Sequence, residues 1–376
     1  MLSLYIHIPF CVRKCRYCGF YSTAYSSSHA DAFITALKYE STSLSKDFRH
    51  KLFSSIYIGG GTPTVLSSEQ FALLAGIIRE DFTIDDGAEF TVEANPNTIT
   101  HDKLSLIRSE GVNRISLGVQ SFSDEVLQIL GRLHTAEQAA DAFRVARSVG
   151  FENISIDLIC GIPGQTADHW EDTLDAAIKL KPEHVSAYNL SLDAGSQFMQ
   201  ESESGEFALP HEDICAAMYE RAVIKLANAG YGRYEISNFS LPGYECRHNM
   251  NYWERGEYLG LGPGAWSFIS GKRYANIADT TEYEQRLSHG RTIIDDQEIV
   301  GSRSSARETV LLSLRTTKGL DLFRFEQEFG RDLLCRLESN AVPLRQAGLL
   351  RMQEGRLTLT DRGIILLDEA LARLSV

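Results

Sequence analysis

Three cysteines near the start of the chain, Cys11, Cys15 and Cys18, fall within eight residues. Cysteine thiolates are soft ligands that select zinc, copper or iron–sulfur clusters. Three of them in a short loop can hold three irons of a 4Fe–4S cubane and leave the fourth iron open for a small molecule. Structural zinc is the alternative, but it requires a fourth ligand, and His7, the candidate for it, lies in a predicted strand.

The elements that must position this loop alternate between two periodicities. Short segments rich in Ile, Val, Phe and Tyr predict six strands: Leu2–Ile8, Ser55–Ile58, Glu89–Glu93, Arg114–Val119, Ile154–Ile159 and His184–Leu190. Helical patterns lie between them, several opened by cap residues: Ser67–Glu80, Asp102–Ser109, Ala136–Val149 and Thr166–Ile178. Strands separated by helices predict parallel βα units, and therefore an α/β fold.

Polar or glycine-rich residues follow four successive strands. Gly59–Thr62 follow the second strand, Glu93 ends the third, Gln120 follows the fourth and Asp157 lies late in the fifth. In a parallel barrel all these strand ends open on one face, which is the catalytic face of that architecture. Strand-end capping is the plain alternative for each residue taken alone. Four in succession favour a shared site.

The second half of the chain has weaker periodicity. We expect loops and one helix, Ile214–Ala229, between Asp193 and Glu245, and then an aromatic stretch, Tyr244–Phe268. From about Ser302 a helix, a small hairpin and a second helix outline a winged helix, whose twelve basic and ten acidic residues argue against DNA reading. The expected domains are a barrel over 1–235, a connecting segment over 236–300 and a mostly helical, winged-helix-like domain over 301–376.

Composition excludes several classes of protein. The 376 residues are 43% hydrophobic and 23% charged, which is ordinary for a globular chain. No apolar run approaches the ~18 residues of a membrane span, and no secretory signal is visible. The net charge of −13 argues against nucleic acid binding by charge alone. Seven cysteines without an export signal indicate a reducing cytoplasm and a metal or cofactor site.

The cysteine spacing, directly after a first strand, resembles the radical S-adenosylmethionine (SAM) superfamily. The resemblance implies that SAM chelates the open iron of a 4Fe–4S cluster, and that the strands form a partial (β/α)6 TIM-like barrel. Further segments look like the oxygen-independent coproporphyrinogen III oxidase family: Tyr5–Cys11, Gly59–Thr64, Glu93–Pro96, Gly118–Phe122 and Asp157–Thr166.

This resemblance implies a set of SAM contacts by position. Tyr5 and Tyr17 would flank the cluster and SAM. The remaining contacts would be made by Gly60, Gly61, Thr62, Glu93, Gln120, Arg132 and Asp157. Each has a plain alternative, since Arg132 would serve equally as a solvated helix cation, Asp157 as a strand-end cap and the two tyrosines as packing residues.

Two features separate the chain from the oxidase branch. Oxidases of the family have a further cysteine where this chain has Phe20, and an N-terminal arm where this chain already begins its first strand. The chain carries instead the H-N-x-x-Y-W motif of HemW-type haem chaperones, within Cys246–Trp253. That resemblance implies haem as ligand, with His248 as axial ligand of the iron and the pocket shaped by Asn249, Tyr252 and Trp253. Cys246 is a competing thiolate, and a satisfied core histidine is the alternative for His248.

The sequence therefore favours a haem chaperone that carries a SAM-binding 4Fe–4S cluster and delivers haem to apo-haemoproteins in the cytoplasm. A coproporphyrinogen III oxidase is the second hypothesis, and an interaction protein with structural zinc and a winged-helix DNA contact is the third. Whether the chain is an enzyme stays open. A homodimer is a candidate assembly, and neither nucleic acid nor an integral membrane segment is expected.

Overall fold

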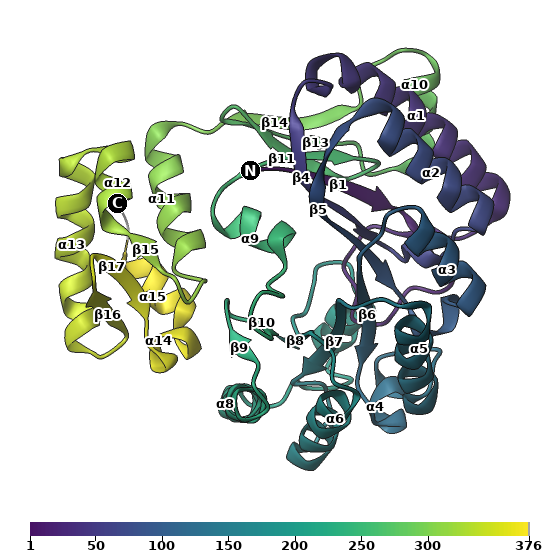
Figure 1. Cartoon of the computed structure of the whole chain (residues 1–376). Coiled ribbons are helices and arrows are strands. Elements are labelled where there is room, and N and C mark those ends of the chain that lie inside the picture. The colour runs from purple at the N-terminus through teal and green to yellow at the C-terminus, as the bar shows by residue number, and fades with distance from the viewer. Residues whose placement is uncertain (375–376) are drawn as a thin grey trace.

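A computed structural model describes residues 1–374 of the chain (Figure 1). The centre of the molecule is a curved sheet whose seven central strands all run parallel. In spatial order they are β11 (Glu257–Leu261), β1 (Leu2–Ile8), β4 (Leu52–Gly60), β5 (Thr83–Ala94), β6 (Arg114–Gln120), β7 (Ile154–Cys160) and β8 (His184–Asn189). The six predicted strands are all present, and the parallel α/β prediction is confirmed.

Short antiparallel strands extend the sheet at both ends. β10 (Asn238–Ser240) and β9 (Gly232–Arg233) follow β8, while β12 (Trp266–Ile269), β13 (Lys272–Asn276) and β14 (Ile294–Ile299) follow β11. The end strands β14 and β9 do not pair with each other in the described chain, so the barrel is partial. Residues 236–300 thus add strands β10–β14 to the same sheet.

One expectation for this region needs correction. The segment Asp193–Glu245 holds not only the helix α8 (Glu212–Asn228) but also α7 (Gln197–Glu203), β9 and β10. The aromatic stretch that follows contains β11, which pairs with β1, and the turn into the antiparallel strand β12. Strands of two to five residues are too short to show a period of two, which is why the sequence pattern missed them.

The helices of the βα units lie along the outer side of the sheet, whereas α9 (Arg247–Trp253) lies on the inner side (Figure 1). The outer helices are α1 (Ser27–Phe48), α2 (Ser68–Asp81), α3 (His101–Ser109), α4 (Asp124–Ile129), α5 (Ala136–Val149), α6 (Ala167–Leu180), α8 and α10 (Thr280–Ser288). Capping boxes at Ser67 with Gln70 and at Thr135 with Gln138 confirm two predicted helix starts. Across residues 1–374, no helix combines the length and apolar character that a membrane crossing needs.

The C-terminal unit has its own hydrophobic core. It contains α11 (Ser302–Ser313), β15 (Leu320–Asp321), α12 (Leu322–Phe329), α13 (Arg331–Gln346), β16 (Leu350–Gln353), β17 (Arg356–Leu359), α14 (Asp361–Ile365) and α15 (Leu367–Arg373). Helix α13, the β16–β17 hairpin and α14 confirm the winged-helix-like outline.

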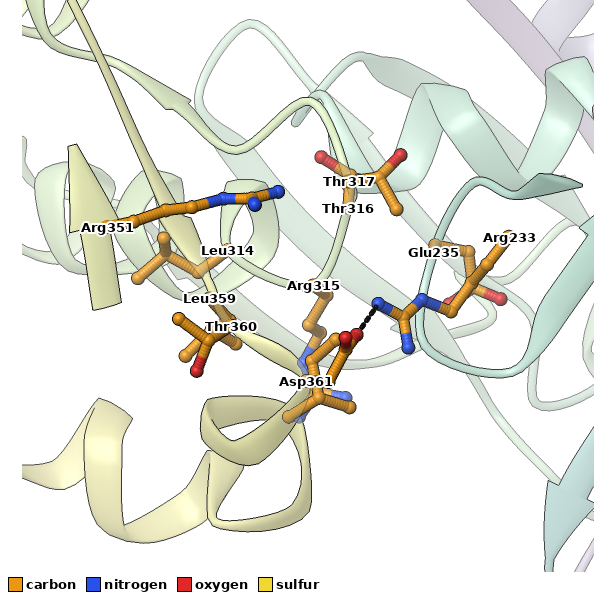
Figure 2. A pocket seen from close by; sticks show the side chains of 11 residues that line it. Arg233, Glu235, Leu314, Arg315, Thr316, Thr317, Arg351, Leu359, Thr360 and Asp361 are labelled. Carbon is orange, nitrogen blue, oxygen red and sulfur yellow. Dashed lines mark hydrogen bonds and ion pairs between the residues drawn. The ribbon is translucent and has the colours of Figure 1, made fainter. Parts of the chain in front are cut away.

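Polar contacts join this unit to the barrel. Arg233 of β9 pairs with Asp361 of α14 at 2.8 Å (Figure 2). Glu235 forms an isolated β-bridge with Thr316 close by. A cavity of about 120 Å³ lies at this junction. The helix α11 also contacts α9, so the C-terminal unit supports the element that carries the predicted haem motif.

Candidate cofactor and haem site

A cavity of about 430 Å³ opens on the inner side of the barrel. Side chains of a strand alternate between its two faces, so every second residue of an inward-facing strand lines this space. On β6 the lining residues are Arg114, Ser116, Gly118 and Gln120. The cavity therefore extends along the whole of β6, from its first residue to its last.

The structure brings most of the predicted site residues onto the wall of this one cavity. They are Cys11, Cys15, Tyr17, Cys18, Gly60, Gly61, Thr62, Glu93, Gln120, Arg132, Asp157 and Asn249. Four predicted residues do not line it: Tyr5, His248, Tyr252 and Trp253. The Tyr5 ring packs against Tyr57 and His248 instead, with centroids 6.3 and 6.4 Å away.

The cysteine loop begins in β2 (Phe10–Cys11), which pairs with β3 (Thr23–Ala24). The Cys11 Sγ lies 3.6 Å from the Thr62 hydroxyl, and Arg132 donates from Nη1 to the Cys15 Sγ over 3.4 Å. Within residues 1–374, no three His, Cys, Asp or Glu side chains converge on a position for a single metal ion. A cubane makes a different demand, because each thiolate binds its own iron. Three free thiols with a guanidinium beside them fit that demand.

Glycines let the backbone after β4 approach this loop closely. A Cβ on Gly61 would lie 2.5 Å from the Phe10 carbonyl oxygen and 3.0 Å from the Cys11 Sγ. Gly60 has φ +107°, a conformation that L side chains rarely adopt, and a Cβ there would meet the His7 ring at 2.6 Å. The tight approach of the two segments leaves no space for a side chain at either glycine.

Two partly buried carboxyl groups line the cavity. Glu93 accepts hydrogen bonds from the Tyr57 hydroxyl at 2.8 Å and from the Gly60 N–H at 3.2 Å. Burial raises the pKa of Glu93 to about 7, and the nearby charge of Asp157 adds to the shift. The oxygens of Asp157 accept from three serine hydroxyls, at 2.7 to 3.0 Å: Ser116, Ser155 and Ser186.

At the end of β6, Gln120 adopts φ +69° and turns the chain away from the sheet. Arg132 donates from Nη2 to the Gly118 carbonyl at 2.6 Å, which fixes its guanidinium between β6 and the cysteine loop. In this arrangement Arg132 is a buried neighbour of Cys15 and is not a solvated helix cation.

The helix α9 is held at its N-terminus by Glu89 of β5. The Glu89 carboxylate accepts the backbone N–H of Arg247 at 3.0 Å and that of His248 at 3.1 Å. The thiol of Cys246 donates to the same carboxylate over 3.4 Å. Cys246 is fully buried and its thiol is bonded to Glu89, so a bond from this sulfur to haem iron would require it to leave that contact.

The imidazole of His248 is buried, with both ring nitrogens hydrogen-bonded. Nδ1 lies 3.0 Å from the Ser55 Oγ, and Nε2 lies 3.0 Å from the Tyr252 hydroxyl. Because Ser55 already donates its hydrogen to Ser3, Nδ1–H must donate to Ser55, and Nε2 then accepts from Tyr252. Burial and the charge of Arg114 lower the pKa of His248 to about 3. The ring is therefore neutral, and its Nε2 lone pair accepts the hydrogen bond of the Tyr252 hydroxyl.

Comparisons with known proteins identify the family of this chain. Residues 5–177 match the radical SAM superfamily, and residues 303–366 match the HemN C-terminal domain. The heme chaperone HemW of Bacillus subtilis is 37% identical over 370 residues, with 98% of both chains covered. The HemW of Lactococcus lactis is also 37% identical, over 96% of this chain and 94% of its own. The chain belongs to the HemW family.

The solved structure of Escherichia coli coproporphyrinogen III oxidase (HemN), a radical SAM enzyme, is similar over the whole of this HemW-family chain. Its TM-score is 0.88 at 27% identity, and the match covers 100% of this chain and 90% of HemN. The partial barrel with its C-terminal helical unit is thus the HemN fold. Radical SAM membership implies a 4Fe–4S cluster and SAM, and the cavity offers the thiols and the close backbone approach that both require.

Sequence reasoning missed several polar residues around this site, namely Ser55, Glu89, Arg114 and His184. Each lies inside a predicted strand or directly at its start. Arg114 shares the alternation of Ser116, Gly118 and Gln120, so a period-two reading of that strand had the signal to find it. Glu89 and Ser55 gave no such signal, since their partners lie more than 150 residues away in the chain.

Proposed function

We propose that this chain binds haem and transfers it to apo-haemoproteins, a role that agrees with its heme chaperone relatives. The observation that carries the proposal is the state of His248. Its ring is neutral, and its Nε2 lone pair meets only the hydroxyl of Tyr252, one turn along the same helix. A neutral imidazole nitrogen is what haem iron binds.

Haem binding at His248 requires a movement, because the ring is 1% exposed in this structure. The helix α9 has only seven residues, and Glu89 and Ser55 are among its anchors. Displacement of the Tyr252 hydroxyl uncovers Nε2, while the Nδ1 bond to Ser55 keeps the ring oriented. Asn249 lines the cavity, whereas Trp253 packs against the buried cluster of Tyr234, Cys246 and Met250.

The cluster and SAM belong to the same proposal. Cys11, Cys15 and Cys18 would hold the cluster, and Gly60, Gly61 and Thr62 would lie along SAM. When bound, the pair supplies a reduced iron–sulfur centre that can pass one electron. Arg132 donates a hydrogen bond to the Cys15 sulfur, and Tyr17 of the same loop packs in a small apolar cluster.

The decisive experiment is an anaerobic haem titration of the cluster-loaded protein, followed by the Soret band. Saturable binding by the wild type that weakens in His248→Ala supports the proposal. His289→Ala is the matched control, since His289 is exposed and far from the cavity in α10's C-terminal cap. Binding that is indifferent to His248 overturns His248 as the ligand.

A coproporphyrinogen oxidase remains the second candidate, favoured by the HemN-like fold. Phe20 occupies the position of the further oxidase cysteine and lines the mouth of the cavity. A conversion assay with SAM and reductant in excess separates the two. Formation of protoporphyrinogen would make the oxidase the favoured function.

The proposal places the chain in the cytoplasm, working on acceptor proteins as a monomer or homodimer. Val12 and Phe20 support a protein-contact role, because both are more than half exposed beside the cysteine loop. Sedimentation of the cluster-loaded protein with and without haem tests the homodimer. Mixing the haem-loaded protein with an apo-haemoprotein and following transfer of the Soret signal tests delivery.

A further inference from the structure

Arg114 is the first residue of β6 and lies deep in the barrel. Only 2% of it is exposed, and its side chain contributes to the wall of the cavity. A guanidinium carries five N–H donors and stays charged in proteins. Burying it without a partner is costly, so its surroundings need to supply an acceptor.

Across the described chain, Arg114 makes no side-chain hydrogen bond and no ion pair, and its Nε is buried without an acceptor. Its neighbour in the strand register is Thr91 of β5, whose hydroxyl is equally buried and without a partner. The charge of Glu89 acts on Arg114, but the oxygens of this carboxylate accept hydrogen bonds from the N-terminus of α9. Arg114 is thus a buried cation on the cavity wall whose Nε lacks an acceptor.

We propose that Arg114 binds a carboxylate group of the ligand, and that this group is a propionate of haem. The assignment rests on the proposed function. A guanidinium holds a carboxylate with two parallel hydrogen bonds, a match of shape as well as of charge. The site lies near His248, whose electrostatics Arg114 influences, and Tyr57 connects the two. The Tyr57 ring lines the cavity and its centroid lies 5.0 Å from that of His248.

SAM also carries a carboxylate, but it belongs to the other end of the cavity. Gln120 and the cysteine loop lie at the C-terminal end of β6, and Arg114 at its N-terminal end. Six residue steps along a strand span roughly 20 Å. A SAM molecule whose amino acid moiety is on the cluster therefore leaves Arg114 free for a second carboxylate.

The test compares haem with its dimethyl ester, in which both propionates are blocked. Dissociation constants of the two are measured with the cluster-loaded wild type, Arg114→Gln and the control Arg79→Gln on the outer surface of α2. A charge-assisted pair contributes roughly 1.5–3 kcal/mol, so the wild type should prefer haem over the ester by roughly 10-fold or more. The preference should fall to nearly equal binding in Arg114→Gln and persist in Arg79→Gln.

An equal preference in the wild type and a folded Arg114→Gln variant overturns the inference. If Arg114→Gln does not retain its cluster, Arg114→Lys is measured in its place. Lysine keeps the charge but lacks the paired N–H donors of a guanidinium. Its preference for haem over the ester should therefore be several-fold smaller than that of the wild type. SAM affinity, measured by calorimetry, should be unchanged in either variant, and a loss of SAM binding would reassign Arg114 to SAM. Haem binding that weakens in the His248 variant but is unchanged in the Arg114 variant supports the proposed function and contradicts only this inference.

Discussion

The Glu89 carboxylate accepts the backbone N–H of His248 at 3.1 Å, although 159 residues separate them in the chain. This contact ties the short helix α9 to the inner face of the sheet. With the Arg247 N–H and the Cys246 thiol, it makes Glu89 the common acceptor for three successive residues. The position of the predicted haem ligand therefore depends on one buried carboxylate of β5.

Replacement of this carboxylate should loosen α9. In Glu89→Ala three donors lose their acceptor, and each buried donor left unpaired costs about 1–3 kcal/mol. We expect faster amide hydrogen exchange in residues 246–253 with little change in α5. Glu203→Ala, on an exposed part of α7, is the control. Unchanged exchange in α9 would show that its packing against α11 holds the helix without Glu89.

Removal of the Tyr252 hydroxyl should favour haem binding. In Tyr252→Phe the Nε2 lone pair of His248 no longer accepts a hydrogen bond, while the ring that shapes the pocket is kept. A net hydrogen bond contributes about 1 kcal/mol, which corresponds to a roughly fivefold lower dissociation constant for haem. Soret titration beside Tyr39→Phe, an exposed tyrosine of α1, measures the change. Weaker binding would mean that the hydroxyl contacts haem directly.

Much of the fold was accessible from the sequence because its signals are local. The six parallel strands show β-rich segments, and the helix starts at Ser67 and Thr135 show cap residues three positions before their partners. The cysteine loop and the strand-end residues follow from spacing and topology alone. No local sequence signal predicts that β11 pairs with β1, because about 250 residues separate the two strands in the chain.

The environment of His248 shows the limit of sequence reasoning at the site. The motif predicts a ligand, but the state of the ring depends on Ser55, 193 residues away, and on burial that only the folded chain defines. The same holds for Arg114, because only the packed barrel leaves its Nε buried without an acceptor.

The close approach at Gly61 makes a sharp prediction for the cluster. In Gly61→Ala the new Cβ would collide with the Phe10 carbonyl and press on Cys11, so the loop must shift. We expect lower iron and sulfide content after anaerobic reconstitution and weaker SAM binding. Gly76→Ala is the matched control, because a Cβ there meets nothing within 4 Å in α2, and the change should stabilise that helix by up to about 1 kcal/mol. Equal cluster content in both variants would contradict the prediction.

The buried carboxyl of Glu40 should make stability depend on pH. Glu40 of α1 accepts hydrogen bonds from the Tyr283 hydroxyl, the Gly262 N–H and the Asn276 amide, and so fastens α1 to the far end of the sheet. Burial raises the pKa of Glu40 from 4.5 to about 7, against the effect of these bonds. The folded state therefore keeps a proton that the unfolded state has already released.

It follows that the contribution of Glu40 is fully present below pH 4.5 and is lost as the pH rises through 7. One pKa unit corresponds to about 1.4 kcal/mol, so the loss reaches about 3 kcal/mol. Relative to the wild type, Glu40→Gln should gain apparent stability between pH 5 and pH 8, measured by thermal unfolding of the cluster-loaded protein. The control Glu203→Gln should follow the wild-type profile. Parallel profiles for Glu40→Gln and the wild type would mean that Glu40 ionises in the folded chain as readily as in the unfolded one, and that its three donors outweigh the cost of burial.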